Sequence, residues 1–114
     1  MGVDILFADS QLEKECNTEK RLVRRYGDER AGHIKRRLSQ LRAANTLEDM
    51  RFLPQAKCHE LHGDRAGQLS VTVGYPYTLI FEPVADDEIH LPDGGLNWTA
   101  VTAIRVLGVE NYHG

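Results

Sequence analysis

The sequence of 114 residues has no long apolar run. No apolar stretch approaches the roughly 18 consecutive residues that a membrane-spanning helix needs. Residues 1–7 also lack the basic region and cleavage site of a secretory signal peptide. We therefore expect a soluble protein of the cytoplasm with no membrane partner. Apolar residues still make up 41% of the chain, enough to bury a core, which excludes a disordered tail.

Cysteine is scarce. Cys16 and Cys58 form no CxxC pair, and no histidine stands at zinc-finger spacing from either. We expect both to be reduced residues of the core. The acidic residues lack calcium-loop spacing, and no phosphate loop, dinucleotide fingerprint or serine elbow is present. The sequence therefore predicts neither a metal site nor a cofactor.

Positive charge is nearly missing from the second half. Residues 59–114 hold 2 basic and 8 acidic side chains (−6), whereas residues 1–58 hold 12 and 9 (+3), which together give the net charge of −3. Residues 20–43 alone hold 9 basic and 2 acidic side chains, or +7. Such asymmetry is typical of a surface for nucleic acid or an acidic partner, and the alternative is a solvated helix face.

The first half predicts a short strand followed by two helices. One helix starts at Asp9 or Ser10 and runs to Gly27, a natural stop, with Leu12, Cys16, Val23 and Tyr26 at near-helical spacing. The second helix covers residues 28–44. The short connection favours an antiparallel helical hairpin. In the second helix an apolar stripe leaves the basic residues on the remaining faces; the stripe comprises Ala31, Ile34, Leu38 and Leu41, and the basic residues are Lys35, Arg36, Arg37 and Arg42.

In the second half, the apolar residues recur at every second position, which is the spacing of a strand. Thr46 and Asp49 resemble a capping box that starts one helical turn. Strands are predicted over residues 58–62, 69–73, 77–81 and 101–109, with turns at 63–67 and 74–76, a loop over 83–97 and a polar tail. We expect one α+β domain over residues 1–114, with the hairpin on one face of a small, mostly antiparallel sheet.

Two clusters could carry chemistry. Alternation along the strand places His59 and Leu61 on one face and His62 on the other, so the two histidines should not share a metal. Arg65, in the following turn, could reach a phosphate, or could form a surface pair with Asp64. If the last strand lies beside that of His59, the terminal Tyr112 and His113 reach the same surface. Imidazoles, an arginine and a tyrosine are the groups that RNA transesterification needs.

Residues 59–71, HELHGDRAGQLSV, resemble the H-x-L-x-G-D-R-x-G-Q-x-S-hydrophobic signature of HigB-type toxins in the RelE/ParE-like superfamily. The resemblance extends over most of the chain and implies a RelE-like curved sheet with its active site on the concave face. It implies a metal-independent, ribosome-dependent mRNA endonuclease, whose partners are the ribosome, mRNA and a HigA-like helix-turn-helix antitoxin.

The resemblance also implies roles for individual residues. His59, Tyr112 and His113 would be catalytic, while Arg65 and His62, together with Arg36 and Arg37 of the second helix, would bind RNA or phosphate. Three positions depart from the pattern, with Asn111 in place of an aspartate, Thr78 in place of an arginine and His62 in place of a lysine. These departures favour as an alternative a degenerate toxin that only binds an antitoxin or another protein. A gyrase-directed toxin of the ParE branch is the third option.

Overall fold

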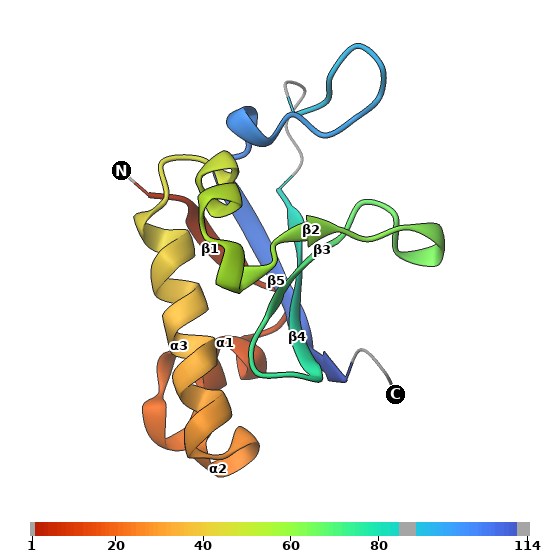
Figure 1. Cartoon of the computed structure of the whole chain (residues 1–114). Coiled ribbons are helices and arrows are strands. Elements are labelled where there is room, and N and C mark those ends of the chain that lie inside the picture. Colours follow the sequence, from red (N-terminus) through yellow and green to blue (C-terminus); the bar gives the residue numbers. More distant parts are fainter. Residues whose placement is uncertain (1, 85–88, 112–114) are drawn as a thin grey trace.

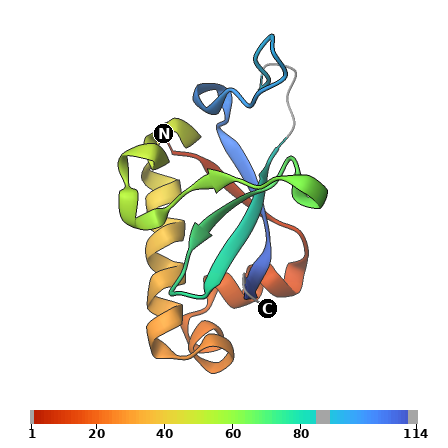
Figure 2. The same cartoon turned by 45° about the vertical axis from the view of Figure 1, so that its right-hand side comes forward.

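A five-stranded sheet in the order β1-β5-β4-β3-β2 forms the centre of the computed structural model, which describes residues 2–84 and 89–111 (Figure 1). The α-helices lie together on one side of this twisted sheet (Figure 2). The strands are β1 (Asp4–Phe7), β2 (His59–Glu60), β3 (Leu69–Thr72), β4 (Tyr77–Pro83) and β5 (Ala103–Asn111). The helices are α1 (Ser10–Asn17), α2 (Glu19–Tyr26) and α3 (Asp28–Ala43), with 3-10 turns η1 (Leu47–Phe52), η2 (Pro54–Ala56), η3 (Gly63–Arg65) and η4 (Trp98–Ala100).

The sheet is mostly antiparallel, as predicted. β1 runs parallel to β5, while β2 with β3, β3 with β4, and β4 with β5 are antiparallel. Because helices precede most of the strands in the chain and pack on one side, the α+β class expected from the sequence is confirmed. None of the helices in the described part of the chain is long and apolar enough to cross a membrane.

The prediction of a single helix up to Gly27 is wrong, because the helix is interrupted at Thr18. Asp9 caps α1 by accepting the Leu12 N–H at 2.8 Å, but Thr18 has an extended backbone (φ −125°, ψ 107°) between α1 and α2. The break shifts the register, so that Leu22 rather than Val23 is the fully buried residue of α2. Gly27 then ends α2 with φ +86°, a conformation that favours glycine, and α3 packs against α2 as a hairpin.

Several predicted boundaries also move. The side chain of Thr46 makes no capping bond, and Asp49 instead accepts the backbone N–H of Asn45 at 2.8 Å, so the capping box is incomplete. β2 is only two residues long because the chain turns into η3, although Leu61 N–H still donates to Gln68. β5 extends to Asn111, so Glu110, predicted to begin a polar tail, lies in the sheet opposite Thr78.

The main hydrophobic core lies between α3 and the sheet. Alternate residues of β3 and β4 enter it, so one face of these strands is committed to packing. Its largest fully buried members include Leu22, Ile34, Leu38, Leu41, Leu47, Met50, Leu69, Val71, Leu79, Phe81 and Ile104.

Arg37 lies in this packed layer, which corrects the expectation that it occupies a solvated helix face. It is 5% exposed, and its guanidinium donates to the Thr72 carbonyl at 2.9 Å, the Gln55 carbonyl at 3.0 Å and Gln40 Oε1 at 3.0 Å. Desolvation, followed by the charge of Arg36, lowers the pKa of Arg37. Arg37 therefore joins α3 to the end of β3 and to η2.

We predict that Arg37→Ala lowers the free energy of unfolding by about 3 kcal/mol, because two backbone carbonyls lose their donor in a buried layer. Urea unfolding followed by circular dichroism measures this loss. Arg36→Ala is the matched control: the neighbouring side chain is exposed, and its change should stay within about 0.5 kcal/mol. Equal losses in both variants would contradict the anchoring role.

Candidate functional site

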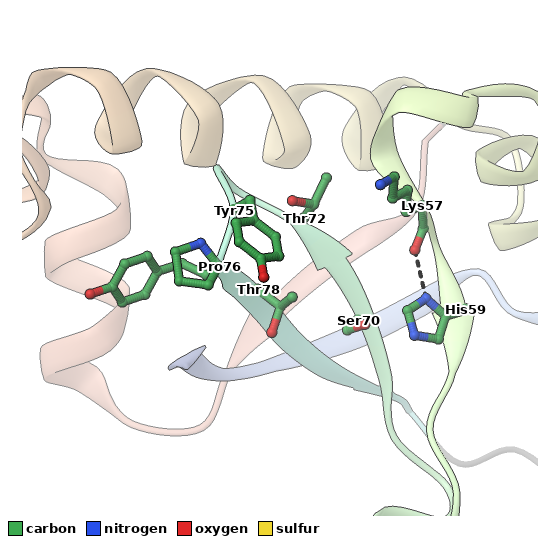
Figure 3. Close-up of a pocket in the computed structure, with 8 residues that line it drawn as sticks. Lys57, His59, Ser70, Thr72, Tyr75, Pro76 and Thr78 are labelled. Carbon is green, nitrogen blue, oxygen red and sulfur yellow. Dashed lines mark hydrogen bonds between the residues drawn. The ribbon is translucent and has the colours of Figure 1, made fainter. Parts of the chain in front are cut away.

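The sheet carries a cavity of about 180 Å³ that contains His59 (Figure 3). Ser70 and Thr72 of β3 alternate with the core residues Leu69 and Val71, so the cavity lies on the face directed away from the main core. The lining residues are Lys57, His59, Ser70, Thr72, Tyr75, Pro76, Tyr77 and Thr78.

Strand register brings these residues together from three segments. His59 of β2 lies opposite Ser70 of β3, and Thr72 of β3 lies opposite Thr78 of β4. The turn between β3 and β4 closes on itself, since Tyr77 N–H donates to the Gly74 carbonyl at 2.8 Å and Val73 N–H donates to the Tyr77 carbonyl at 3.0 Å. The cavity is thus built on paired strands and a hydrogen-bonded turn.

The imidazole of His59 is held in one tautomer. Its Nδ1 lies 2.7 Å from the Lys57 carbonyl oxygen, and because a carbonyl only accepts, Nδ1 carries the proton. The neutral ring therefore has its lone pair on Nε2, the form that a general base requires. Lys57 has φ +50°, in the left-handed region, and this backbone conformation directs its carbonyl to the ring (Figure 3).

Two hydroxyls of the cavity have no hydrogen-bond partner in the described part of the chain. Ser70 is 0% exposed, and Thr78 also has a buried Oγ1. An unsatisfied buried hydroxyl costs about 1–3 kcal/mol, so such groups call for a partner from outside the protein. A hydroxyl both donates and accepts, which suits a ribose or a phosphate oxygen.

The thiol next to the histidine is not a nucleophile. Burial raises the pKa of Cys58 to about 12, with a smaller opposing effect from Arg51. Burial, and then Glu15, likewise raises the pKa of Cys16 to about 11. Because only a thiolate attacks, the raised pKa of Cys58 does not support a Cys58–His59 catalytic pair. Both cysteines are free thiols, and Cys16 is buried as expected.

Arg65 forms an ion pair across the sheet with Glu110, with both side chains more than two-fifths exposed. The surface pair of Arg65 with Asp64, predicted as an alternative, is therefore replaced by a pair with a residue 45 positions away. Glu110 lies opposite Thr78 in β5, so a carboxylate stands close to the face that holds His59.

None of the remaining predicted site residues that the structure describes lines this cavity. His62 lines a different cavity, of about 500 Å³, with Glu60 and His90, so the two histidines are separated as alternation predicts. Arg36 is exposed on α3, and Arg37 is buried. Tyr112 and His113 lie outside the described residues. Among the residues that the structure describes, no group of three or more histidine, cysteine or acidic side chains could hold a metal.

Sequence reasoning missed most of the lining. Lys57, Ser70, Thr72 and Tyr75 received no role, although Ser70 belongs to the signature and its alternation with Leu69 was visible. Tyr75 is 82% exposed, which neither its type nor its spacing indicates. The conformation of Lys57 leaves no signal in the sequence, because lysine is not a residue that favours a positive φ.

We predict that the native protein resists a thiol reagent such as a disulfide dye at pH 8, because both thiols remain protonated below their raised pKa values. Absorbance of the released dye should report no fast-reacting thiol in native buffer and two in denaturant. A fast-reacting thiol that is lost in Cys58→Ala would contradict the raised pKa of the half-buried Cys58.

No protein-family model matches this sequence, and no curated protein matches it. The fold is similar to that of a solved structure, the YoeB/ParE toxin from Agrobacterium tumefaciens, with a TM-score of 0.52. The likeness covers 95% of this chain and 96% of that chain at 11% sequence identity. The chain therefore shares the fold of that toxin, and the similarity shows the fold alone.

Proposed function

We propose that this protein is the toxin of a type II toxin–antitoxin system, a single domain over residues 1–114 that cleaves ribosome-bound mRNA without a metal. The observation that carries the proposal is His59 at a cavity of a toxin-like fold, with its Nδ1 bonded to the Lys57 carbonyl so that Nε2 carries the lone pair of the neutral ring. The HigB-like signature of residues 59–71 supports the RNA-cleaving branch.

The proposed reaction is transesterification within the RNA. His59 Nε2 removes the proton of a ribose 2′-hydroxyl, whose oxygen attacks the adjacent phosphorus. The bond from phosphorus to the 5′-oxygen breaks, giving a 2′,3′-cyclic phosphate, and the leaving oxygen receives a proton from an acid. We assign that acid to His113, and to Tyr112 the orientation of a base. Asn111, which directly precedes both, lies opposite Tyr77 of the cavity.

Charge outside the cavity suits a ribosomal RNA surface. Lys20, Arg21 and Arg24 of α2 and Arg36 of α3 are exposed, and none has an ion pair within the described residues. Neutralising RNA phosphates with such side chains gives sequence-independent affinity. His62, exposed at the separate cavity of about 500 Å³, and Arg65 at the edge of the sheet extend our assignment of RNA contacts. A helix-turn-helix antitoxin of the HigA type is the proposed protein partner.

A binding-only toxin is the second candidate, and Glu110 favours it. Its carboxylate pairs with Arg65, the cation assigned to phosphate, so RNA must compete with an internal partner for that guanidinium. A toxin that only binds an antitoxin would keep this pair. Cleavage of ribosome-bound message separates the two candidates.

We predict that induced expression of the wild-type protein arrests growth, and that His59→Ala with His113→Ala abolishes the arrest, because both proton transfers are lost. Colony counts and pulse labelling of new protein measure the effect. Lys14→Ala is the matched control, since it removes an exposed charge of α1, to which we assign no RNA contact, and leaves the cavity intact.

Equal toxicity of the double variant and the wild type would contradict the assignment of catalysis to these histidines. Double-strand breaks in DNA that depend on gyrase would instead favour the ParE-like target. A harmless wild-type protein that still binds an antitoxin tightly would favour the binding-only candidate.

A further inference from the structure

We propose that Lys57 is the phosphate-binding cation of the His59 cavity, and that the cavity takes one phosphodiester of single-stranded RNA with its base against Tyr75. The inference rests on the proposed function, because it names how the same site holds its substrate. It assigns a role to a side chain that no motif singled out.

Charge is the first observation. Among the described residues that line the cavity, Lys57 is the one permanently charged side chain. Two of the arginines assigned to phosphate already have partners in the protein. Arg65 is paired with Glu110, and Arg37 donates its hydrogen bonds to groups of the chain itself. A phosphate bound in the cavity at His59 therefore has Lys57 as the permanently charged cation among the described lining residues.

The geometry of Lys57 is the second observation. Its backbone, at φ +50°, positions the carbonyl oxygen to accept the hydrogen bond from His59 Nδ1 (Figure 3). The same residue also lines the cavity. One residue thus sets the tautomer of the base and delivers a cation beside it. Within the part of the chain that the structure describes, the Lys57 ammonium has no hydrogen bond or ion pair and keeps three donors for a ligand.

The hydroxyls and the aromatic ring identify the ligand class. Ser70 Oγ and Thr78 Oγ1 are buried without a partner and line the cavity that Lys57 enters, so they can donate to phosphate oxygens. Tyr75, 82% exposed at the same cavity, offers a ring face on which an unstacked base can rest. A carboxylate of an acidic peptide would use the ammonium but has no flat ring to stack on an aromatic side chain, as a base does.

The test is binding of a single-stranded RNA oligonucleotide with 2′-O-methyl groups, which cannot be cleaved. Fluorescence anisotropy follows Kd over a range of salt for the wild type and for Lys57→Met, Lys57→Gln and Lys57→Arg. We expect roughly tenfold to hundredfold weaker binding for the Met and Gln variants, as for loss of a charged hydrogen bond. The slope of log K against log salt should fall by about 0.7, the contribution of one single-strand phosphate contact. Lys57→Arg should retain most of the affinity and most of the salt dependence.

Lys14→Met is the matched control, because it removes the same charge from an exposed position of α1 that does not line the cavity. Equal weakening by Lys14→Met, an unchanged slope in Lys57→Met and Lys57→Gln, or no RNA binding by the wild type would overturn the inference. Circular dichroism shows whether each variant is folded. Failure of the proposed function is a separate result. RNA binding that depends on Lys57, without any cleavage of ribosome-bound message, would support the phosphate-binding role of Lys57 and contradict the proposed nuclease activity.

Discussion

The guanidinium of Arg37 connects the helical layer to both walls of the candidate site. It donates to the carbonyl of Thr72, at the end of β3 and in the cavity lining, and to the carbonyl of Gln55 in η2, two residues before Lys57. A buried guanidinium has few alternative partners, so these bonds fix where η2 lies against β3. His59, four residues after Gln55, is then held opposite Ser70 by the pairing of β2 with β3.

The site that results is small, and its parts depend on one another. The left-handed conformation at Lys57 aims a carbonyl at His59 and so selects the tautomer with a basic Nε2. Paired strands place buried hydroxyls beneath it, and the ion pair of Arg65 with Glu110 joins the η3 turn to β5. The net charge of −3 is a poor guide to such a site, because the charge that matters is the one beside the reacting atoms.

The sequence predicted the class and order of elements well, because hydrophobic period and turn residues act locally. The break at Thr18 was missed since spacing alone does not show which of two registers, Leu22 or Val23, packs better. Arg37 was placed on the surface by residue type, although it stands three residues after Ile34 and so lies on the buried stripe. Among the predicted site residues, His59 lines the cavity, whereas the pairing of Arg65 with Glu110 depends on strand register that no local pattern encodes.

The central claim is that His59 acts as a base in cleaving ribosome-bound message. Reconstituted translation with purified ribosomes, in which the ends of a defined mRNA are mapped at nucleotide resolution, tests it most directly. The account predicts cuts with 2′,3′-cyclic phosphate ends only when ribosomes are present, and a rate at least about 100-fold lower for His59→Ala. Intact message with the wild-type protein, or equal cutting by His59→Ala, would contradict it.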